Sequence, residues 1–282
     1  IRDRFEASWI PLIVLAIFKL FRLNIIGISH DVTSFGKKEN QFARTFIYSK
    51  LIDKIIVHNN FSYNYLKQVL PHKILTKTKI IKHGGHNTVI NAKIEKSKAR
   101  QYLGLEQHKT YGLFFGQIKK VKGLDLLLNA FPNEFENLDL IIAGKPWKNE
   151  FEVYQKIIND RNLSKKTKLF VKYISEIERD NLYNAADFII LPYREIFQSG
   201  VLLMAMSYGL PILASDLAAN KEVIVDEGLL FKTEDVKDLN LKIKKIALDE
   251  KLRNNYSKKS QIKIKEEYSW DKIAINYFDL IV

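Results

Sequence analysis

Short apolar runs alternate with longer segments of mixed polarity along most of the chain. The runs are rich in isoleucine, leucine, valine and phenylalanine and end at glycine, proline or polar residues, as in buried parallel strands. The strands expected in this way are residues 24–29, 54–57, 79–82, 188–191 and 212–214, and a second sheet is expected to start at Tyr111. The helices between and around them include residues 9–23, 40–51, 61–70, 95–103 and 201–206. Strands that alternate with helices at this spacing predict an α/β fold with parallel, doubly wound sheets.

The segment 186–216 carries the strongest chemical signal. It is predicted to form a buried strand, a loop, a helix and a second buried strand, with Gln198-Ser199-Gly200 at the start of the helix. Ser199 can cap that helix, Gly200 lets a ligand approach the backbone, and the free amides at the helix start favour an anion. The pattern therefore predicts an anion site, and a diphosphate is the most obvious occupant.

This segment resembles the donor-binding core of retaining glycosyltransferases of the GT-B type, family 4. Three further stretches fall in the family's order: a strand, basic loop and helix at 113–131, a strand and turn at 140–145, and the segments 220–224 and 228–231. The resemblance therefore extends over residues 113–231, and its four motifs together are far more specific than any one of them.

The resemblance implies two Rossmann-like, doubly wound domains that face a cleft. Residues 1–90 would form the later part of the acceptor-side domain, which we expect to be incomplete at its N-terminus. Residues 91–268 would form the donor-binding domain, and 269–282 a last helix that crosses back to the first domain. Ligands of such sheets bind beyond the carboxyl ends of the strands. His30, His83, Lys119, Lys145, Tyr173 and the Gln198 loop are therefore expected to converge on one cleft.

Composition narrows the class of partner. The 282 residues are 46% hydrophobic, carry a net charge of +13 and include no cysteine. The length suffices for two domains, and the charge favours an anionic partner such as a nucleotide-sugar, a phospholipid surface or a nucleic acid. The lack of cysteine excludes disulfides and thiolate metal sites and is compatible with a reducing cytoplasm.

The apolar segment 9–23 is interrupted by Pro11, Lys19 and Arg22. It is shorter than the roughly 20 apolar residues that span a bilayer, and no small-residue cleavage site follows it, as a signal peptide would require. A helix packed on a sheet is the preferred interpretation, and a helix lying on a membrane is the alternative.

Glycines and lysines surround the first turn of the predicted donor domain. Lys119 and Lys122 lie in a loop flanked by Gly116 and Gly123, where lysines can reach a phosphate. Gln117 stands where the family often has arginine, so a lysine would supply the charge without the bidentate geometry of a guanidinium.

Histidine positions suggest a site in the first domain. His30 ends a predicted strand and matches the place where the family holds a histidine near the transferred sugar. The competing interpretation is an ordinary capping or core histidine. His58 and His86 could join a metal cluster by composition alone, but no spacing supports one and the fold's chemistry requires none. We therefore expect no metal and no cofactor.

The chain departs from the family at two carboxylates. An alignment without gaps places Ile196 and Met204 where the family typically carries two glutamates. Glu195 is adjacent to the first place and could replace it as the catalytic carboxylate, whereas nothing replaces the second. Further donor contacts are expected from Gln198, Ser199, Gly200 and Val201 at the helix start, and from Glu222 beside the sugar or ribose.

We expect a metal-independent, retaining hexosyltransferase that uses a nucleotide-sugar and a glycan or lipid-linked acceptor in bacterial surface polysaccharide or glycoconjugate synthesis. Its expected location is cytoplasmic, with peripheral contact to the inner face of the plasma membrane through the basic run 242–267 as an option. A GT-B epimerase, a non-catalytic donor-binding subunit and, less readily, a basic nucleic-acid-binding protein are the alternatives. No nucleic-acid-binding module is recognised in the sequence.

Overall fold

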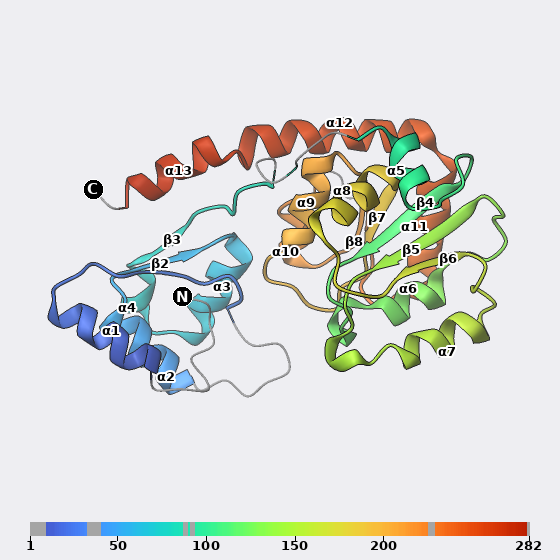
Figure 1. Ribbon diagram of the computed structural model, residues 1–282. Coiled ribbons are helices and arrows are strands. Elements are labelled where there is room, and N and C mark those ends of the chain that lie inside the picture. Colours follow the sequence, from blue (N-terminus) through green and yellow to red (C-terminus); the bar gives the residue numbers. More distant parts are fainter. Residues whose placement is uncertain (1–9, 33–40, 87–89, 91–93, 225–228, 281–282) are drawn as a thin grey trace. The chain divides into compact units, whose positions relative to one another are not determined.

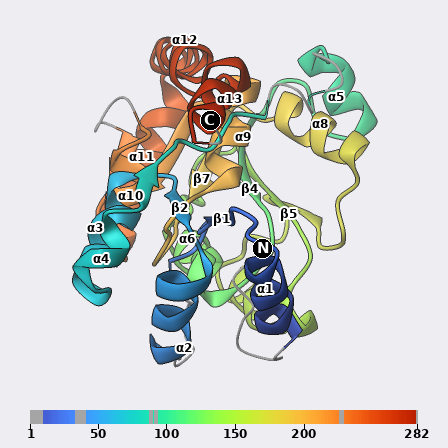
Figure 2. The same ribbon diagram turned by 90° about the vertical axis from the view of Figure 1, so that its left-hand side faces the viewer.

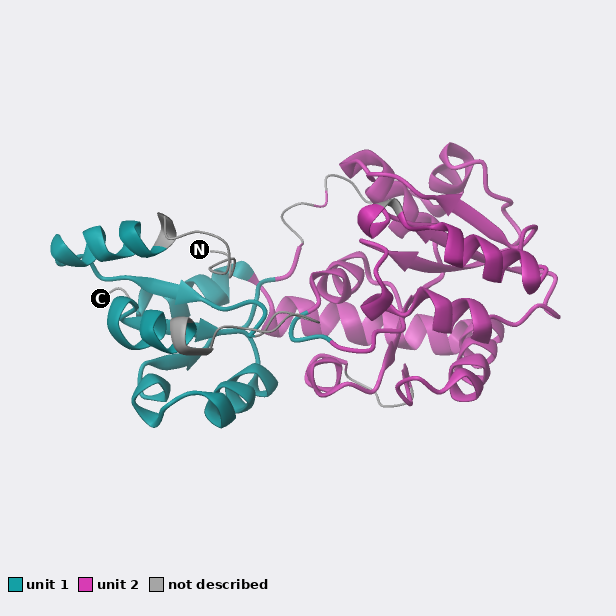
Figure 3. Cartoon of the chain, turned by 90° about the horizontal axis from the view of Figure 1, so that it is seen from below, with its two compact units in different colours: residues 1–84, 196–198, 270–282 teal, residues 85–195, 199–269 magenta. Residues whose placement is uncertain are grey.

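The computed structural model describes residues 10–32, 41–86, 90, 94–224 and 229–280. The chain divides into two compact units (Figure 3): unit 1 comprises residues 1–84, 196–198 and 270–282, and unit 2 comprises residues 85–195 and 199–269. Each unit contains its own parallel sheet. Trp9, Asn40 and Gly228, which begin predicted segments, lie outside the described residues.

Unit 1 has a three-stranded parallel sheet in the order β1-β2-β3. Its elements are α1 (Ile10–Leu20), β1 (Ile26–Ile28), α2 (Gln41–Phe46), the π-helix η1 (Ile47–Leu51), β2 (Lys54–Val57), α3 (Asn60–Val69), α4 (His72–Leu75), β3 (Thr78–Ile80) and α13 (Trp270–Phe278). The single helix predicted for residues 40–51 is thus an α-helix that continues as a π-helix. The short α4 was not predicted.

The central strand β2 is buried on both faces because helices cover the two sides of the sheet (Figures 1 and 2). Ile55 and Val57 pack into a cluster with residues of α1, η1, α3 and α4, whereas Ile56 packs with Ile273 and Leu280 from the tail. This alternation follows from the two-residue period of a strand. The helix α13 therefore belongs to the core of unit 1.

Helix α1 packs on unit 1 through one side only. Leu15 is fully buried, while Ile13, Ile17 and Phe18 are each more than 40% exposed. The prediction of a helix packed on the sheet describes its inner side, and an apolar surface remains on its outer side. Among the described helices, none is both long enough and apolar enough to cross a membrane.

Unit 2 has a six-stranded parallel sheet in the order β6-β5-β4-β7-β8-β9. Its strands are β4 (Thr110–Phe115), β5 (Leu138–Ala143), β6 (Thr167–Phe170), β7 (Phe188–Leu191), β8 (Ile212–Ser215) and β9 (Leu230–Phe231). The chain winds outward from β4 to β6 and then returns to place β7 beside β4. The direction of winding therefore reverses between β4 and β7, where ligands of such sheets bind.

Helices cover both faces of this sheet (Figure 1). The helices of unit 2 are α5 (Lys96–Tyr102), the 3-10 turn η3 (Lys120–Lys122), α6 (Leu124–Ala130), the 3-10 turn η4 (Trp147–Asn149), α7 (Glu152–Asp160), α8 (Glu176–Ala185), α9 (Gly200–Tyr208), α10 (Ala218–Lys221), α11 (Val236–Leu248) and α12 (Glu250–Glu267). One layer contains α6, α7 and α11, and the other contains α5, α8 and α9. The basic run 242–267 forms parts of two helices, because Asp249 ends α11 and caps α12.

Candidate functional site

A basic loop follows β4 at the point where the winding reverses. We call residues 116–123 the phosphate loop. Gly116 and Gly123 have φ angles of +111° and +68°, which favour glycine. A Cβ on Gly123 would lie 1.8 Å from the Pro192 carbonyl oxygen, and one on Gly144 would lie 1.9 Å from the Gly116 carbonyl oxygen. The turns after β4, β5 and β7 therefore pack backbone against backbone, and only glycine fits at these contacts.

Two lysines of the phosphate loop lie against aromatic rings. The Lys119 ammonium is 4.4 Å from the centre of the Trp147 ring, and the Lys122 ammonium is 3.8 Å from the centre of the Tyr193 ring. Such cation–π contacts limit the motion of a long side chain. Gln117, in contrast, is exposed.

Arg194 holds the phosphate loop in place. Its two terminal nitrogens each donate to Asp125 at 2.9 Å, one of them also donates to the Lys120 carbonyl at 2.7 Å, and Nε donates to Glu234 at 2.8 Å. The Arg194 amide donates to the Val121 carbonyl as well. The guanidinium therefore ties the loop after β7 to η3 and to the start of α6.

The charges in this contact are mutually stabilised. Burial acts to raise the pKa of Asp125, but the hydrogen bonds and charge of Arg194 outweigh it and hold that pKa below its ordinary value. Asp125 raises the pKa of Arg194 in turn. Sequence reasoning missed Arg194, because its partner Asp125 lies 69 residues away.

Helix α9 begins at the adjacent strand end. As predicted, Ser199 caps it: the hydroxyl accepts from the Leu202 amide at 3.1 Å. The first carbonyl contact inside the helix runs from the Leu203 amide to Ser199. The amides of Gly200 and Val201 are thus the ones at the positive end of the helix that can meet a ligand. A Cβ on Gly116 would lie 3.4 Å from Val201, so the phosphate loop begins beside this helix end.

The loop before α9 packs into unit 1. Phe197 is buried and stacks on Phe61 with ring centres 5.4 Å apart. The Asn59 amide donates to the Phe197 carbonyl and, at 3.2 Å, to the side-chain oxygen of Gln198. The oxygen of Gln198 is therefore already engaged, which leaves its NH₂ group as the part that can donate to a ligand.

The two family carboxylate positions are apolar and at least partly buried. Ile196 is buried and Met204 is half-buried on α9, whereas Glu195 is exposed. Glu222 follows α10 rather than opening a helix, so its carboxylate lies near a helix end of negative polarity.

A hollow of about 360 Å³ lies at the carboxyl ends of β5 and β6. It brings together Lys145 and Tyr173, two of the predicted donor residues. The complete lining is Lys145, Pro146, Phe151, Val171, Lys172 and Tyr173. An aromatic ring that is 80% exposed, apolar walls and two lysines suit a flat, polar-edged ligand.

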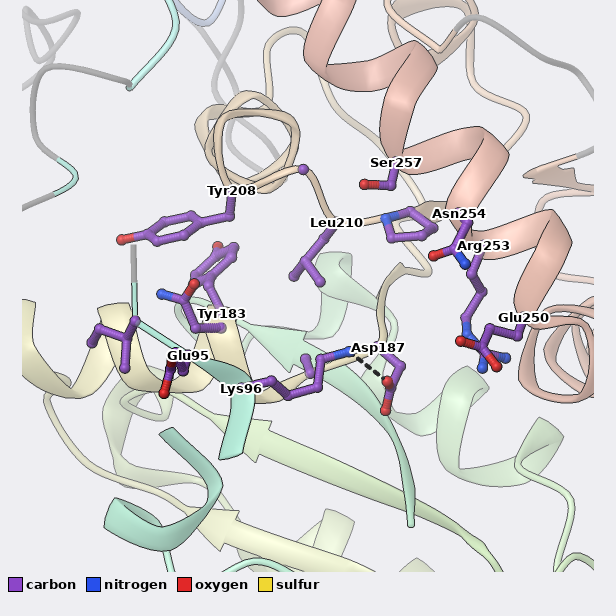
Figure 4. A pocket seen from close by; sticks show the side chains of 15 residues that line it. Glu95, Lys96, Tyr183, Asp187, Tyr208, Leu210, Glu250, Arg253, Asn254 and Ser257 are labelled. Atoms are coloured by element: carbon purple, nitrogen blue, oxygen red, sulfur yellow. Dashed lines mark hydrogen bonds and ion pairs between the residues drawn. The ribbon is translucent and has the colours of Figure 1, made fainter. Parts of the chain in front are cut away.

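A hollow of about 440 Å³ lies at the opposite, amino-terminal edge of the same sheet (Figure 4). Three of its charged side chains have partners within the protein: Lys96 pairs with Asp187 at 2.8 Å, and Arg253 donates to the carbonyls of Ile246 and Ala247. Tyr183 and Tyr208 stack on one side of it. The hollow therefore lies away from the carboxyl ends of the strands, where the basic loop and the start of α9 are found.

Three histidines lie together in unit 1, where β1, β2 and β3 end. The rings of His30, His58 and His83 have centres 4.6–5.6 Å apart. His58 Nδ1 is 2.9 Å from the Ile81 carbonyl, and its Nε2 is 3.0 Å from His30 Nδ1. Burial and, to a smaller extent, the charges of its two histidine neighbours lower the pKa of His58 to about 4, although the hydrogen bond to the Ile81 carbonyl acts in the opposite direction.

Sequence reasoning named His30 and His83 but treated His58 only as a possible metal ligand. Among the described residues, no group of three His, Cys, Asp or Glu side chains is arranged to hold a metal ion.

Comparisons with known proteins agree with this architecture. The profile of the family described as Glycosyl transferases group 1 matches residues 95–263, more than half of the chain. Spore coat protein SA of Bacillus subtilis is 27% identical over 192 residues, which cover 64% of this chain and 50% of that protein. The lipopolysaccharide 1,2-N-acetylglucosaminetransferase of Salmonella typhimurium is 27% identical over 232 residues, which cover 78% and 60%.

The structure of Anabaena HepE in complex with UDP-glucose has the same fold. It superposes with a TM-score of 0.82 at 17% identity, over 96% of this chain and 75% of that one. The matched part of the chain spans 50% of the length of spore coat protein SA and 60% of the length of the lipopolysaccharide transferase.

Proposed function

Because the chain belongs to the glycosyl transferases group 1 family, we propose that it is part of a hexosyltransferase that uses a nucleoside-diphosphate-sugar. The acceptor would be a glycan or a lipid-linked sugar of the bacterial surface. The observation that carries the proposal is the anion site of unit 2, where a capped helix start and a clamped basic loop meet at the reversal point of a parallel sheet. The lipopolysaccharide transferase and the UDP-glucose complex among its relatives support the choice of substrate class.

For each part of the donor we propose a counterpart in unit 2. The diphosphate would accept hydrogen bonds from the amides of Gly200 and Val201 and face the ammonium groups of Lys119 and Lys122. The nucleobase would stack in the hollow formed by Lys145 and Tyr173. The remaining candidates Gln117, Ser199 and Glu222 would contact ribose or sugar hydroxyls.

The proposed chemistry is electrostatic. When the bond between the sugar and the diphosphate breaks, negative charge builds on the leaving group, and fixed amides and lysines would stabilise it. No metal is needed for that task, so transfer should persist in a chelator. His30 is the proposed side chain beside the transferred sugar, and retention of configuration is the proposed outcome.

The half-buried Met204 favours one second candidate, a non-catalytic donor-binding subunit, because the family has a glutamate at that place. An epimerase would share the donor site but would change a donor that is incubated alone. Product analysis with and without acceptor separates the three functions.

Titration of nucleoside diphosphates by calorimetry tests the donor site. We expect Lys122→Ala to weaken binding by removing charge, and Gly200→Val by blocking access to the amides. A Cβ on Gly200 would come no closer than 3.8 Å to its nearest neighbour, the side chain of His86. Lys156→Ala, an exposed lysine paired with Asp160 on α7, is the matched control. Unchanged affinity in both site variants would place the diphosphate elsewhere.

A second experiment asks which side chain takes over from the family's glutamates, whose places are occupied by Ile196 and Met204. If Gln198 positions the donor, Gln198→Ala should lower turnover by the equivalent of about 1–3 kcal/mol, because a polar contact is lost. If Glu195 acts instead, Glu195→Gln should lower turnover while the melting temperature stays nearly constant. Normal transfer by both variants would support the non-catalytic candidate.

Peripheral membrane contact is a further part of the proposal. The exposed apolar side of α1 in unit 1 and, independently of it, the basic side chains of α11 and α12 in unit 2 are the proposed surfaces for anionic lipid. Sedimentation with phosphatidylglycerol vesicles, but not with phosphatidylcholine vesicles, is the expected result.

A further inference from the structure

The hollow of about 440 Å³ at the amino-terminal edge of the unit 2 sheet has the size of a small-molecule site. We call it the amino-edge hollow. All of its lining residues belong to unit 2, and none belongs to the phosphate loop or to the first turn of α9. Small-molecule sites have volumes of roughly 300–1,000 Å³ and combine an apolar wall with a few polar groups. The chemistry of the lining therefore indicates which class of ligand fits.

One wall of the amino-edge hollow is apolar and held in place. Tyr208 lines the hollow, is partly exposed, and stacks on the buried Tyr183 with ring centres 4.8 Å apart. The Tyr208 hydroxyl donates to the buried carboxylate of Asp180, and Figure 4 shows this hydroxyl turned away from Leu210. Leu210 and Pro211 continue the wall. The ring of Tyr208, and not its hydroxyl, is therefore the part that can meet a ligand.

The other wall is polar and is formed by one face of α12 (Figure 4). The side chains of this face follow the helical spacing i, i+3, i+4, i+7: Glu250, Arg253, Asn254 and Ser257. One terminal nitrogen of Arg253 donates to two carbonyls at the end of α11, at 2.8 and 2.6 Å, which fixes the guanidinium. Within the part of the chain that the structure describes, the side chains of Asn254 and Ser257 have no hydrogen-bond partner. Both can donate as well as accept.

The charges around the hollow do not favour an anion. Its lining includes two cationic side chains and three carboxylates. The ammonium of Lys96 is already paired with Asp187 at 2.8 Å, and the Asp187 carboxylate also accepts from Arg100 at 2.8 Å. A nucleotide or another phosphate would bring further negative charge next to these carboxylates, and like charges in contact are unfavourable. The lining therefore favours an uncharged ligand.

We propose that the amino-edge hollow is a second carbohydrate site, which holds one neutral sugar residue, either free or within a glycan. A sugar ring presents an apolar face of C–H groups and an edge of hydroxyl groups that donate and accept. The face would lie on the ring of Tyr208 and on Leu210, and the hydroxyl groups would bond to Asn254 and Ser257. This site goes beyond the transfer proposed above and is independent of it, because no residue proposed for the donor lines the hollow.

Titration of the ¹⁵N-labelled full chain with methyl glycosides of glucose, mannose, galactose and N-acetylglucosamine tests the site. At least one sugar should shift the amide signals of α12 near Asn254. Asn254→Leu keeps the approximate shape of the side chain but removes its amide, so binding should weaken roughly three- to tenfold, the effect of about one hydrogen bond. Asn255→Leu makes the same change at the next position, which is exposed but does not line the hollow, and should leave binding unchanged.

Two further measurements sharpen the test. Ser257→Trp places a large ring in the hollow and should abolish binding, and thermal unfolding checks that each variant is folded. Maltotetraose and chitotetraose distinguish the two sources of the sugar: tighter binding than that of the methyl glycosides indicates a unit of a glycan, and equal or weaker binding indicates a free sugar. Lys122→Ala, in the phosphate loop, should not alter the affinity for any of these sugars.

The outcomes separate this site from the donor site. Absence of binding by every sugar, or equal affinities in Asn254→Leu and Asn255→Leu, would overturn the proposal. Amide shifts confined to the phosphate loop and the start of α9 would also overturn it, because the sugar would then occupy the donor site. Shifts of the α12 amides with UDP but with no sugar would contradict the neutral class of ligand. Failure of UDP to bind at all would count against the proposed transferase and leave the sugar titration decisive for this site.

Discussion

Replacement of Arg194 by glutamine would show whether the clamp on the phosphate loop, and not only its lysines, sets nucleotide affinity. The substitution removes the bidentate contact to Asp125, the bond to the Lys120 carbonyl and the contact to Glu234. The backbone bond from Arg194 to Val121 stays, so the loop is loosened and not released.

The magnitude can be worked from these contacts. A hydrogen bond to a charged group contributes about 1.5–3 kcal/mol, but Arg194 and Asp125 are 21% and 30% exposed, which requires a reduction for solvent screening. The contact to Glu234, which is 62% exposed, adds about 0–1 kcal/mol at most. We therefore expect Arg194→Gln to lower the free energy of unfolding of unit 2 by about 2–3 kcal/mol.

The effect on binding follows from the order of the phosphate loop. In Arg194→Gln, binding of a nucleoside diphosphate would have to fix the conformation of at least one loop residue that Arg194 no longer holds. Fixing one residue costs about 1–2 kcal/mol of conformational entropy, so the affinity should fall roughly tenfold. Arg194→Lys should recover little, because an ammonium cannot make the bidentate contact. Calorimetry with UDP and thermal unfolding measure the two effects.

A control separates binding from stability. Arg161→Gln removes a guanidinium that donates to the carbonyls of Asn129 and Phe131 in the same unit, and it should lower the melting temperature without any change in UDP affinity. In a double-mutant cycle, Arg194→Gln and Asp125→Asn should show a coupling of about 1–2 kcal/mol. Unaltered UDP affinity in Arg194→Gln, or a coupling near zero, would refute the reasoning.

Two other predictions concern stability. Gly123→Ala places a Cβ 1.8 Å from the Pro192 carbonyl oxygen at a φ of +68°, whereas the Cβ of Gly104→Ala meets nothing within 4 Å at a φ of +65°. Thermal unfolding should show that the free energy of unfolding falls by about 1–2 kcal/mol in Gly104→Ala and by at least twice as much in Gly123→Ala. Equal losses in the two variants would contradict the close packing at Gly123. The pKa of His58 is lowered from 6.5 to about 4 by folding, so the unfolded chain takes up the proton first as the pH falls. The stability that neutral His58 contributes is complete above pH 6.5, and about 3 kcal/mol of the free energy of unfolding is lost as the pH falls from 6.5 to 4. His58→Phe should lack this loss. If the free energies of unfolding of the native chain and of His58→Phe changed in parallel with pH, the lowered pKa of His58 would be excluded as the cause.

The sequence by itself determined the features that depend on near neighbours along the chain. Apolar runs between glycine and proline turns predicted the strands, and Ser199 before Gly200 predicted a capped helix start, because strand burial and capping involve residues only a few positions apart. The lysines of the phosphate loop were found in the same way. The break of the basic run at Asp249 was missed, although a capping carboxylate is itself a local signal.

Only the tertiary structure decided which distant side chains meet. Arg194 reaches Asp125 because β7 lies beside β4, and that order of strands is a property of the whole sheet. Asn59 meets Gln198 across 139 residues for the same kind of reason. His30 meets His58 at the end of another strand, and this contact also follows from partners in space, which no pattern of neighbouring residues encodes.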